Sequence, residues 1–103
     1  MKTIVMKFGG AATATPAHFN RIAEIVRQKE MEFAQIIVVV SAMAKTTDHL
    51  IELAKPIHPS PPQREVDMLI SAGERISISL LAMALCKQGR PAISFTGSQS
   101  GII

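Results

Sequence analysis

The chain opens with an apolar run that closes on a lysine and two glycines: Thr3-Ile4-Val5-Met6-Lys7-Phe8-Gly9-Gly10. β-Branched and apolar residues at this density predict a buried strand over residues 2–8, and the glycines predict a tight turn after it. Glycines let the backbone come close to a ligand, and the amides of such a turn can point at an anion. Because the adjacent lysine adds a point charge suited to phosphate, this opening stretch predicts a phosphate site.

Size and composition indicate one compact domain. The 103 residues are 48% hydrophobic, which is enough for a packed core, and 18% charged. The net charge is +3, but the basic residues are scattered along the chain, and neither Trp nor Tyr is present to stack on bases. A nucleic-acid partner is therefore not expected.

The cysteine content and the apolar runs indicate a cytoplasmic protein. The single cysteine, Cys86, has no partner for an internal disulfide, which suits a reducing compartment. No signal peptide is recognisable, and the longest apolar stretches, 36–40 and 76–86, are too short or too interrupted to cross a membrane. The histidines and the cysteine lack the spacing of a zinc site, so we expect neither a membrane partner nor a protein-bound metal.

Hydrophobic periodicity predicts three helices and two further strands. The expected helices cover residues 16–30, 47–54 and 64–88, and the further strands cover 35–41 and 92–95. Thr15 as N-cap, with Pro16 after it, suits the start of the first helix. The run 36–40 shows no alternation of apolar and polar residues, which is typical of a strand buried on both faces of a parallel sheet.

The longest predicted helix carries two glycine signals. Gly73 lies inside it, where we expect a break or a kink. Gly89 suits the position just after its last residue, and Pro91 prevents the helix from continuing.

The order of these elements predicts an α/β fold, a three-layer αβα arrangement with a mostly parallel sheet. Ligands in such sheets bind beyond the carboxyl ends of the strands, which are residues 7–12, 41–47 and 96–101 here. All three segments are rich in small and polar residues and two of them carry a lysine, so we expect one ligand site there. The sequence has neither the GxGxxG fingerprint nor the P-loop motif, which disfavours those two phosphate-binding classes.

Four segments, in register over nearly the whole chain, resemble the aspartate kinases of the amino-acid kinase superfamily. They are Lys7-Phe8-Gly9-Gly10, Val39-Val40-Ser41-Ala42-Met43 with Thr47-Asp48, Glu65-x-Asp67-x-Leu69 with Ser71-Ala72-Gly73-Glu74, and Ser94-Phe95-Thr96-Gly97 with Gln99-x-Gly101-Ile102. The resemblance implies ATP-dependent phosphorylation of the side-chain carboxylate of L-aspartate to 4-phospho-L-aspartate. That reaction opens the pathway to lysine, threonine, methionine and diaminopimelate. ATP with Mg²⁺ and L-aspartate are the partners that the resemblance implies.

The same resemblance implies roles for individual residues. Lys7, as the catalytic residue, is expected to neutralise charge on the transferring phosphoryl group. The ATP phosphates are expected to contact Lys7, Phe8, Gly9 and Gly10, and the aspartate to contact Ser41, Thr47 and Glu74. Glu74 is expected to face the α-ammonium group of the substrate, which distinguishes an amino acid from a plain carboxylic acid.

Two departures from the family pattern bear on activity. The glycine turn continues with Ala11-Ala12 where the family has Thr-Ser, so two hydroxyls are missing, and the nearest substitutes are Thr13 and Thr15. Family kinase domains are also much longer and are followed by regulatory domains. We therefore expect residues 1–103 to be the N-terminal portion of a catalytic domain, an incomplete fold that is inactive alone and a homo-oligomer when full length.

Two alternatives stay open on the sequence. One is another amino-acid kinase, acting on glutamate or N-acetylglutamate, although Ser71-Ala72-Gly73-Glu74 and Ser41-Ala42-Met43 favour aspartate kinase. The other is a non-catalytic fragment that assembles with a complementary chain, which the missing hydroxyls and the short length favour.

Overall fold

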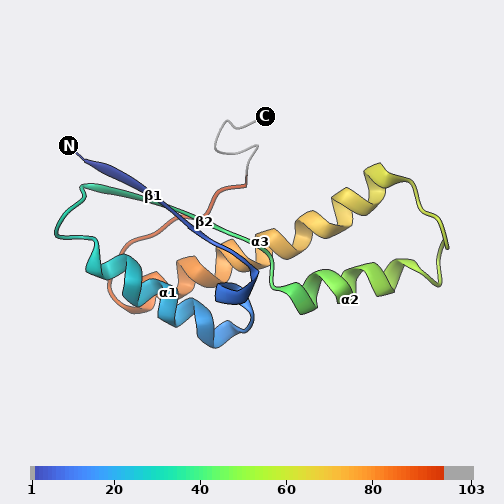
Figure 1. Ribbon diagram of the computed structural model, residues 1–103, viewed down its shortest axis with the longest axis horizontal. Helices are drawn as coiled ribbons and strands as arrows, with labels where there is room; N and C mark the ends of the chain where they lie inside the picture. The colour runs from blue at the N-terminus through green and yellow to red at the C-terminus, as the bar shows by residue number, and fades with distance from the viewer. Residues whose placement is uncertain (1, 97–103) are drawn as a thin grey trace.

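A computed structural model describes residues 2–96 of the protein (Figure 1). Its elements follow in the order β1 (Thr3–Phe8), the 3-10 turn η1 (Gly10–Thr13), α1 (Pro16–Gln28), β2 (Gln35–Val40), α2 (Ala44–Ala54) and α3 (Gln63–Lys87). The α/β fold expected from the sequence is confirmed. β1, α1 and β2 form a βαβ unit, whereas α2 and the first half of α3 form a helical hairpin that extends away from the sheet (Figure 1).

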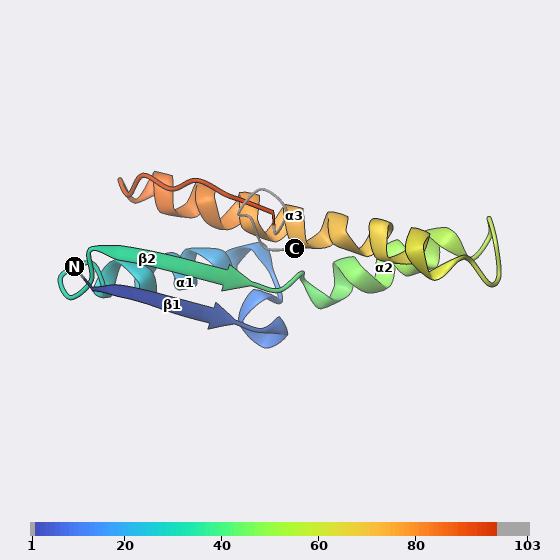
Figure 2. The same ribbon diagram turned by 90° about the horizontal axis from the view of Figure 1, so that it is seen from above.

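The sheet consists of β1 and β2 in parallel, with Thr3 opposite Gln35 and Phe8 opposite Val40. A parallel pair needs a crossover connection, which α1 supplies. α1 packs on one face of the sheet, and α3 lies against both α1 and β2 (Figure 2). The buried core where these elements meet consists of Phe19, Ile22, Ala23, Val26, Val40, Leu81, Ala84 and Leu85.

The opposite face of the sheet is apolar but uncovered by the described residues. Exposure alternates along both strands, and Val5, Ile37 and Val39 on the outer face are 63%, 52% and 47% exposed. The prediction that the second strand is buried on both faces is therefore wrong for residues 2–96. Its lack of alternation reflects two apolar faces, of which only one has a helix layer in this part of the chain. The three-layer arrangement is incomplete, as expected.

The third predicted strand is absent from the described structure. Residues 92–95 belong to no ladder within residues 2–96, and the prediction of a strand there is wrong. A strand requires a neighbour whose backbone groups it can bond, but this segment runs beside the last turns of α3, where the Cys86 thiol lies 3.9 Å from the Ala92 carbonyl oxygen. The predicted loop 96–101 lies, after Thr96, outside the described residues.

The helix ends follow the predicted signals with small shifts. α1 begins at Pro16 with Thr15 as its extended N-cap, but the Thr15 hydroxyl bonds His18 Nδ1 at 2.7 Å instead of a backbone amide. α1 ends at Gln28 instead of residue 30, and α2 begins at Ala44 instead of residue 47.

The predicted break in α3 does not occur, because the helix is continuous from Gln63 to Lys87. Gly89 follows the C-cap in the left-handed region at φ 83°, as predicted for the residue after the helix. The uninterrupted helix also corrects the expectation that the apolar stretches are too short or too interrupted to cross a membrane. By length and composition alone it could cross one, since an 18-residue window has a mean hydropathy of 1.5. A single such helix is weak support for a membrane span, and this one packs along α1 and α2.

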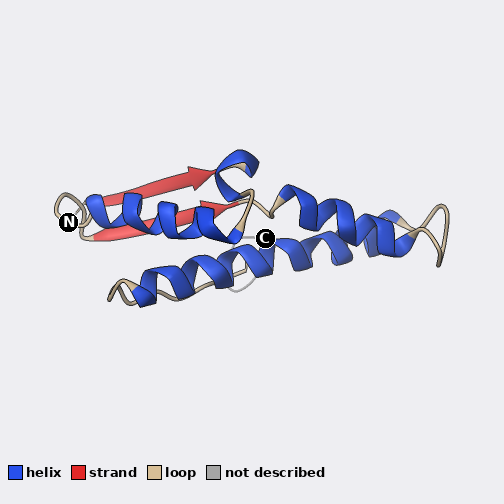
Figure 3. Cartoon of the chain, turned by 90° about the horizontal axis from the view of Figure 1, so that it is seen from below, coloured by secondary structure: helices blue, strands red, loops and turns tan. Residues whose placement is uncertain are grey.

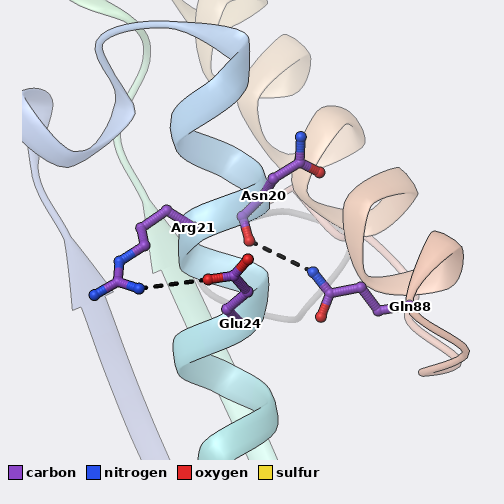
Figure 4. Close-up of polar contacts among 4 residues, drawn as sticks. All are labelled: Asn20, Arg21, Glu24 and Gln88. Atoms are coloured by element: carbon purple, nitrogen blue, oxygen red, sulfur yellow. Dashed lines mark hydrogen bonds and ion pairs between the residues drawn. The ribbon is translucent and has the colours of Figure 1, made fainter.

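A polar contact joins the first half of α1 to the C-terminal end of α3 at the surface (Figure 4). The Gln88 side-chain amide donates to the Asn20 carbonyl oxygen at 3.5 Å, beside an exposed ion pair between Arg21 and Glu24 at 3.4 Å (Figure 4). Exposed pairs of this kind add little to stability. The buried apolar side chains between the helices therefore hold α3 in place.

One polar atom in this core lacks a partner. Ser77 is fully buried on α3, in line with Gly73 and Leu81, and its hydroxyl has no hydrogen-bond partner among residues 2–96. Burying an unsatisfied hydroxyl costs free energy of about 1–3 kcal/mol.

Replacing Ser77 by alanine should therefore stabilise the fold. Ser77→Ala removes the unsatisfied hydroxyl and improves helix propensity, so we expect the free energy of unfolding in urea to rise by about 1 kcal/mol. Ser79→Ala is the matched control, because the Ser79 hydroxyl already donates to the Arg75 carbonyl oxygen at 2.8 Å. A loss of stability in Ser77→Ala that exceeds the loss in the control would contradict this account.

Candidate functional site

The carboxyl ends of the two strands lie side by side, which brings two of the predicted loops together. Beyond the last paired residues, the Ser41 N–H donates to the Phe8 carbonyl oxygen at 3.2 Å. This bond extends the ladder by one step and joins Ser41 to the residue before the glycine turn. Residues 7–10 and Ser41 therefore form one edge of the sheet, at the tips of the strand arrows in Figure 3.

The glycine turn is held from within by a buried threonine. Gly9 is extended and precedes η1, and the Ala12 N–H donates to the Gly9 carbonyl oxygen at 3.0 Å. Thr13 is fully buried, and its hydroxyl lies 3.3 Å from the Gly9 carbonyl oxygen and 3.4 Å from the Gly10 carbonyl oxygen. Apart from the glycine itself and the residues next to it in the chain, no described atom lies within 4 Å of the place that a Cβ would take at Gly9 or Gly10. The outer side of the turn is therefore open to a ligand.

Lys7 projects from the uncovered face of the sheet. It is exposed, it alternates with Phe8 on the inner face, and it pairs with the exposed Val39. No described carboxylate forms an ion pair with Lys7. Its positive charge is therefore not neutralised by residues 2–96.

The residues predicted to bind aspartate come from three different elements. Ser41 is half-buried after β2, and Thr47 lies in the first turn of α2, where its N–H donates to the Met43 carbonyl oxygen at 3.2 Å. Glu74 is exposed on α3, one residue after Gly73. Gly73 packs on Ala42 and on the Thr46 side chain, so the turn of α3 that carries Glu74 lies against the segment 41–47.

The side chains predicted to bind aspartate are not bonded to one another or to Lys7 in the described structure. Residues 2–96 contain no hydrogen bond between the side chains of Ser41, Thr47 and Glu74, and no ion pair between Lys7 and Glu74. The missing hydroxyls of Ala11 and Ala12 are not replaced either. Thr13 points inward to the turn, and the Thr15 hydroxyl is bonded to His18.

Two features of the site were not evident in the sequence. Gly73 was interpreted as a helix break but serves as a close contact, and the small Ala42 in the facing loop was the available signal. The buried role of Thr13 had no distinctive signal, because threonine is mostly found on the surface.

An apolar surface hollow lies elsewhere in the described structure. It has a volume of about 230 Å³ and is lined by apolar side chains near the free end of the hairpin, among them Leu53, Ile57, Val66 and Leu69. None of the predicted site residues lines it, and its apolar walls do not suit phosphate. The described residues also contain no group of three or more His, Cys, Asp or Glu that could hold a metal ion.

Comparison with known proteins identifies the family. The model of the amino acid kinase family matches residues 2–102. The chain belongs to the amino acid kinase family. Among curated members it is 48% identical over 103 residues to an aspartokinase of Mycolicibacterium smegmatis and 49% identical over 102 residues to one of Bacillus sp. strain MGA3. These matches cover 100% and 99% of the chain but only 24% and 25% of the relatives, so the chain spans about a quarter of their length.

A solved structure supports the same family assignment. The crystal structure of aspartate kinase from Synechocystis superposes with a TM-score of 0.85 at 45% sequence identity. The superposition covers 94% of this chain and 17% of that one. The fold of this chain therefore resembles one part of that aspartate kinase structure.

The Thr13 hydroxyl should contribute measurably to the glycine turn. Thr13→Val keeps the shape of the side chain but removes the donor to the Gly9 and Gly10 carbonyls, so we expect the free energy of unfolding to fall by about 0.5–1.5 kcal/mol. Thr13→Ser keeps the hydroxyl and serves as the control for that bond. Urea unfolding of the three proteins decides the point, and a Thr13→Val protein as stable as the parent would refute it.

Proposed function

We propose that this chain forms the phosphoryl-handling and aspartate-binding part of an aspartate kinase. The reaction is transfer of the ATP γ-phosphate to the side-chain carboxylate of L-aspartate, which yields 4-phospho-L-aspartate. The observation that carries the proposal is the joined strand edge, where the bond between Ser41 N–H and the Phe8 carbonyl places the lysine–glycine turn next to the segment 41–47. The aspartokinases among its relatives favour aspartate as the acceptor.

Lys7 and the glycine turn handle the phosphate side in this proposal. Phosphoryl transfer depends mainly on positioning and on stabilising the charge that spreads over the transferring group. An unpaired lysine beside open backbone amides meets both needs, because the ammonium attracts the phosphate oxygens and the amides of Gly9 and Gly10 can donate to them. Phe8 contributes through its backbone, which anchors Ser41.

The aspartate side consists of Ser41, Thr47 and Glu74. The hydroxyls donate to the substrate carboxylates, and the Glu74 carboxylate pairs with the α-ammonium group. This pairing selects a free amino acid over its N-acetylated form, because acetylation removes the positive charge. It separates aspartate kinase from N-acetylglutamate kinase but not from glutamate kinase.

The residues of this site fit Mg²⁺ only as an ion that would be bound to the phosphates of ATP. Mg²⁺ prefers oxygen ligands and keeps several waters, and it is commonly held by phosphates with one or two carboxylates. The described residues offer no carboxylate cluster, so the ATP phosphates hold the ion in this proposal. When bound, it neutralises phosphate charge next to Lys7.

We further propose that residues 1–103 are the N-terminal portion of the catalytic domain of a cytoplasmic protein that is a homo-oligomer when full length. The uncovered face with Val5, Ile37 and Val39 supports the view that further structure packs there. The same face favours the second candidate function, a fragment that assembles with a complementary chain.

A fusion enzyme tests the proposed function. Residues 1–103 replace the matching 103-residue segment of the Mycolicibacterium smegmatis relative, and ADP formation is measured with aspartate, glutamate or N-acetylglutamate. The acyl phosphate is trapped with hydroxylamine. We expect aspartate-dependent turnover in the fusion, a loss of roughly 100-fold or more in its Lys7→Ala variant, and none in the chain alone.

The controls separate the possible outcomes. The unaltered relative shows that the assay works, and circular dichroism shows that the fusion is folded. A folded fusion without aspartate-dependent turnover would overturn the proposal, and turnover with glutamate alone would identify the alternative kinase. Activity that returns when the chain is mixed with the separately expressed remainder of the relative would support assembly from two chains.

Restoring the missing hydroxyls should raise activity. A hydrogen bond to a charged group is worth about 1.5–3 kcal/mol, so Ala11→Thr with Ala12→Ser should raise kcat/KM for aspartate in the fusion by roughly tenfold or more. Ala17→Ser, which adds a hydroxyl at an exposed position of α1, is the matched control and should change nothing. An unchanged kcat/KM in the double variant would show that Ala11 and Ala12 do not limit the reaction.

A further inference from the structure

We propose that Gly73 is a positioning residue whose missing side chain sets how closely α3 approaches the segment 41–47. The consequence is that Gly73 fixes the place of Glu74 relative to Ser41 and Thr47. The inference rests on the proposed function, because it names the residue that determines the geometry of the aspartate side of that site.

One added methyl group at Gly73 would crowd the contact between α3 and the facing loop. A Cβ at this buried glycine would lie 3.2 Å from the Ala42 Cβ, and 3.7 Å from both Leu50 Cδ1 and Thr46 Cγ2. The two longer distances are ordinary van der Waals contacts. The shortest one is tighter than carbon atoms normally approach, so the facing loop or the helix would have to move by a few tenths of an ångström.

Space, and not backbone conformation, explains the glycine. Gly73 lies inside a helix of 25 residues, where glycine costs roughly 1 kcal/mol relative to alanine. Gly89 is the only described glycine with a positive φ, so Gly73 has a helical backbone that alanine would adopt at lower cost. The close approach to Ala42 is the feature that an alanine would lose.

A shift at this contact would move the residues predicted to bind aspartate, both in the segment 41–47 and on α3. Ala42 follows Ser41, whose N–H is bonded to the Phe8 carbonyl, and Thr46 precedes Thr47 in the first turn of α2. On the other side, Glu74 moves with the helix. α3 cannot retreat as a unit, because its second half is buried against α1 through Leu81, Ala84 and Leu85.

The test adds a methyl group at position 73 and then removes the methyl group at position 42. In the fusion enzyme, Gly73→Ala is expected to raise KM for aspartate roughly threefold to tenfold and to leave KM for ATP unchanged, because small misplacements of binding groups are costly. Gly73→Ala with Ala42→Gly returns the space and should restore KM for aspartate. Ser79→Ala, on α3 away from the contact, is the control for improved helix propensity and should leave both KM values unchanged.

The outcomes are distinct from those that test the proposed function. An unchanged KM for aspartate in Gly73→Ala, an equal rise in both KM values, or a double variant that fails to restore KM would each overturn the inference. If the parent fusion lacks aspartate kinase activity, the proposed function fails and with it the role in aspartate binding. Urea unfolding of the parent, Gly73→Ala, Ala42→Gly and the double variant then decides the contact: a coupling between positions 42 and 73 supports it, and additive effects refute it.

Discussion

The parallel pairing of β1 with β2 is the constraint on which the site depends. Register places Phe8 opposite Val40, and the Ser41 N–H adds one more bond to the Phe8 carbonyl. A shift of one residue would turn Lys7 from the open face of the sheet into the core, because side chains alternate with a period of two. Phe19, Ile22 and Val26 of α1 are buried against the inner face of the sheet. Their burial favours this register, because this register turns the apolar side chains of both strands toward α1.

Much of this arrangement could be predicted from the sequence, because local rules decide it. The strand before Gly9 follows from its run of β-branched and apolar residues, and the helix start at Pro16 and the helix stop at Gly89 follow from the dihedral preferences of single residues. The juxtaposition of residues 7–10 with Ser41 then follows from topology alone, since parallel strands end at the same edge of the sheet.

The errors arose where a neighbour decides the outcome. The segment 92–95 has strand-like composition but no ladder partner among residues 2–96, and the run 36–40 has an apolar outer face without a covering layer. Gly73 also shows that local rules are not sufficient. Local propensity disfavours a glycine inside a helix, but α3 continues through Gly73. A contact with Ala42, far away in sequence, explains it. The phosphate site at Lys7, Gly9 and Gly10 was predicted from local residue properties, whereas the roles of Ser41, Thr47 and Glu74 were suggested by family resemblance.

The uncovered face bears directly on the chemistry, because Lys7 stands on it between Val5 and the neighbouring Val39. Two unit charges about 4 Å apart attract by about 1 kcal/mol in bulk water but by about 4 kcal/mol at the effective dielectric constant near a protein surface. A layer packed over Val5, Ile37 and Val39 would exclude water beside Lys7 and strengthen its attraction for a phosphoryl group. Burial of these apolar residues would therefore have two effects under the proposed function: it would stabilise the sheet, and it would strengthen the electrostatic effect of Lys7 on a phosphoryl group.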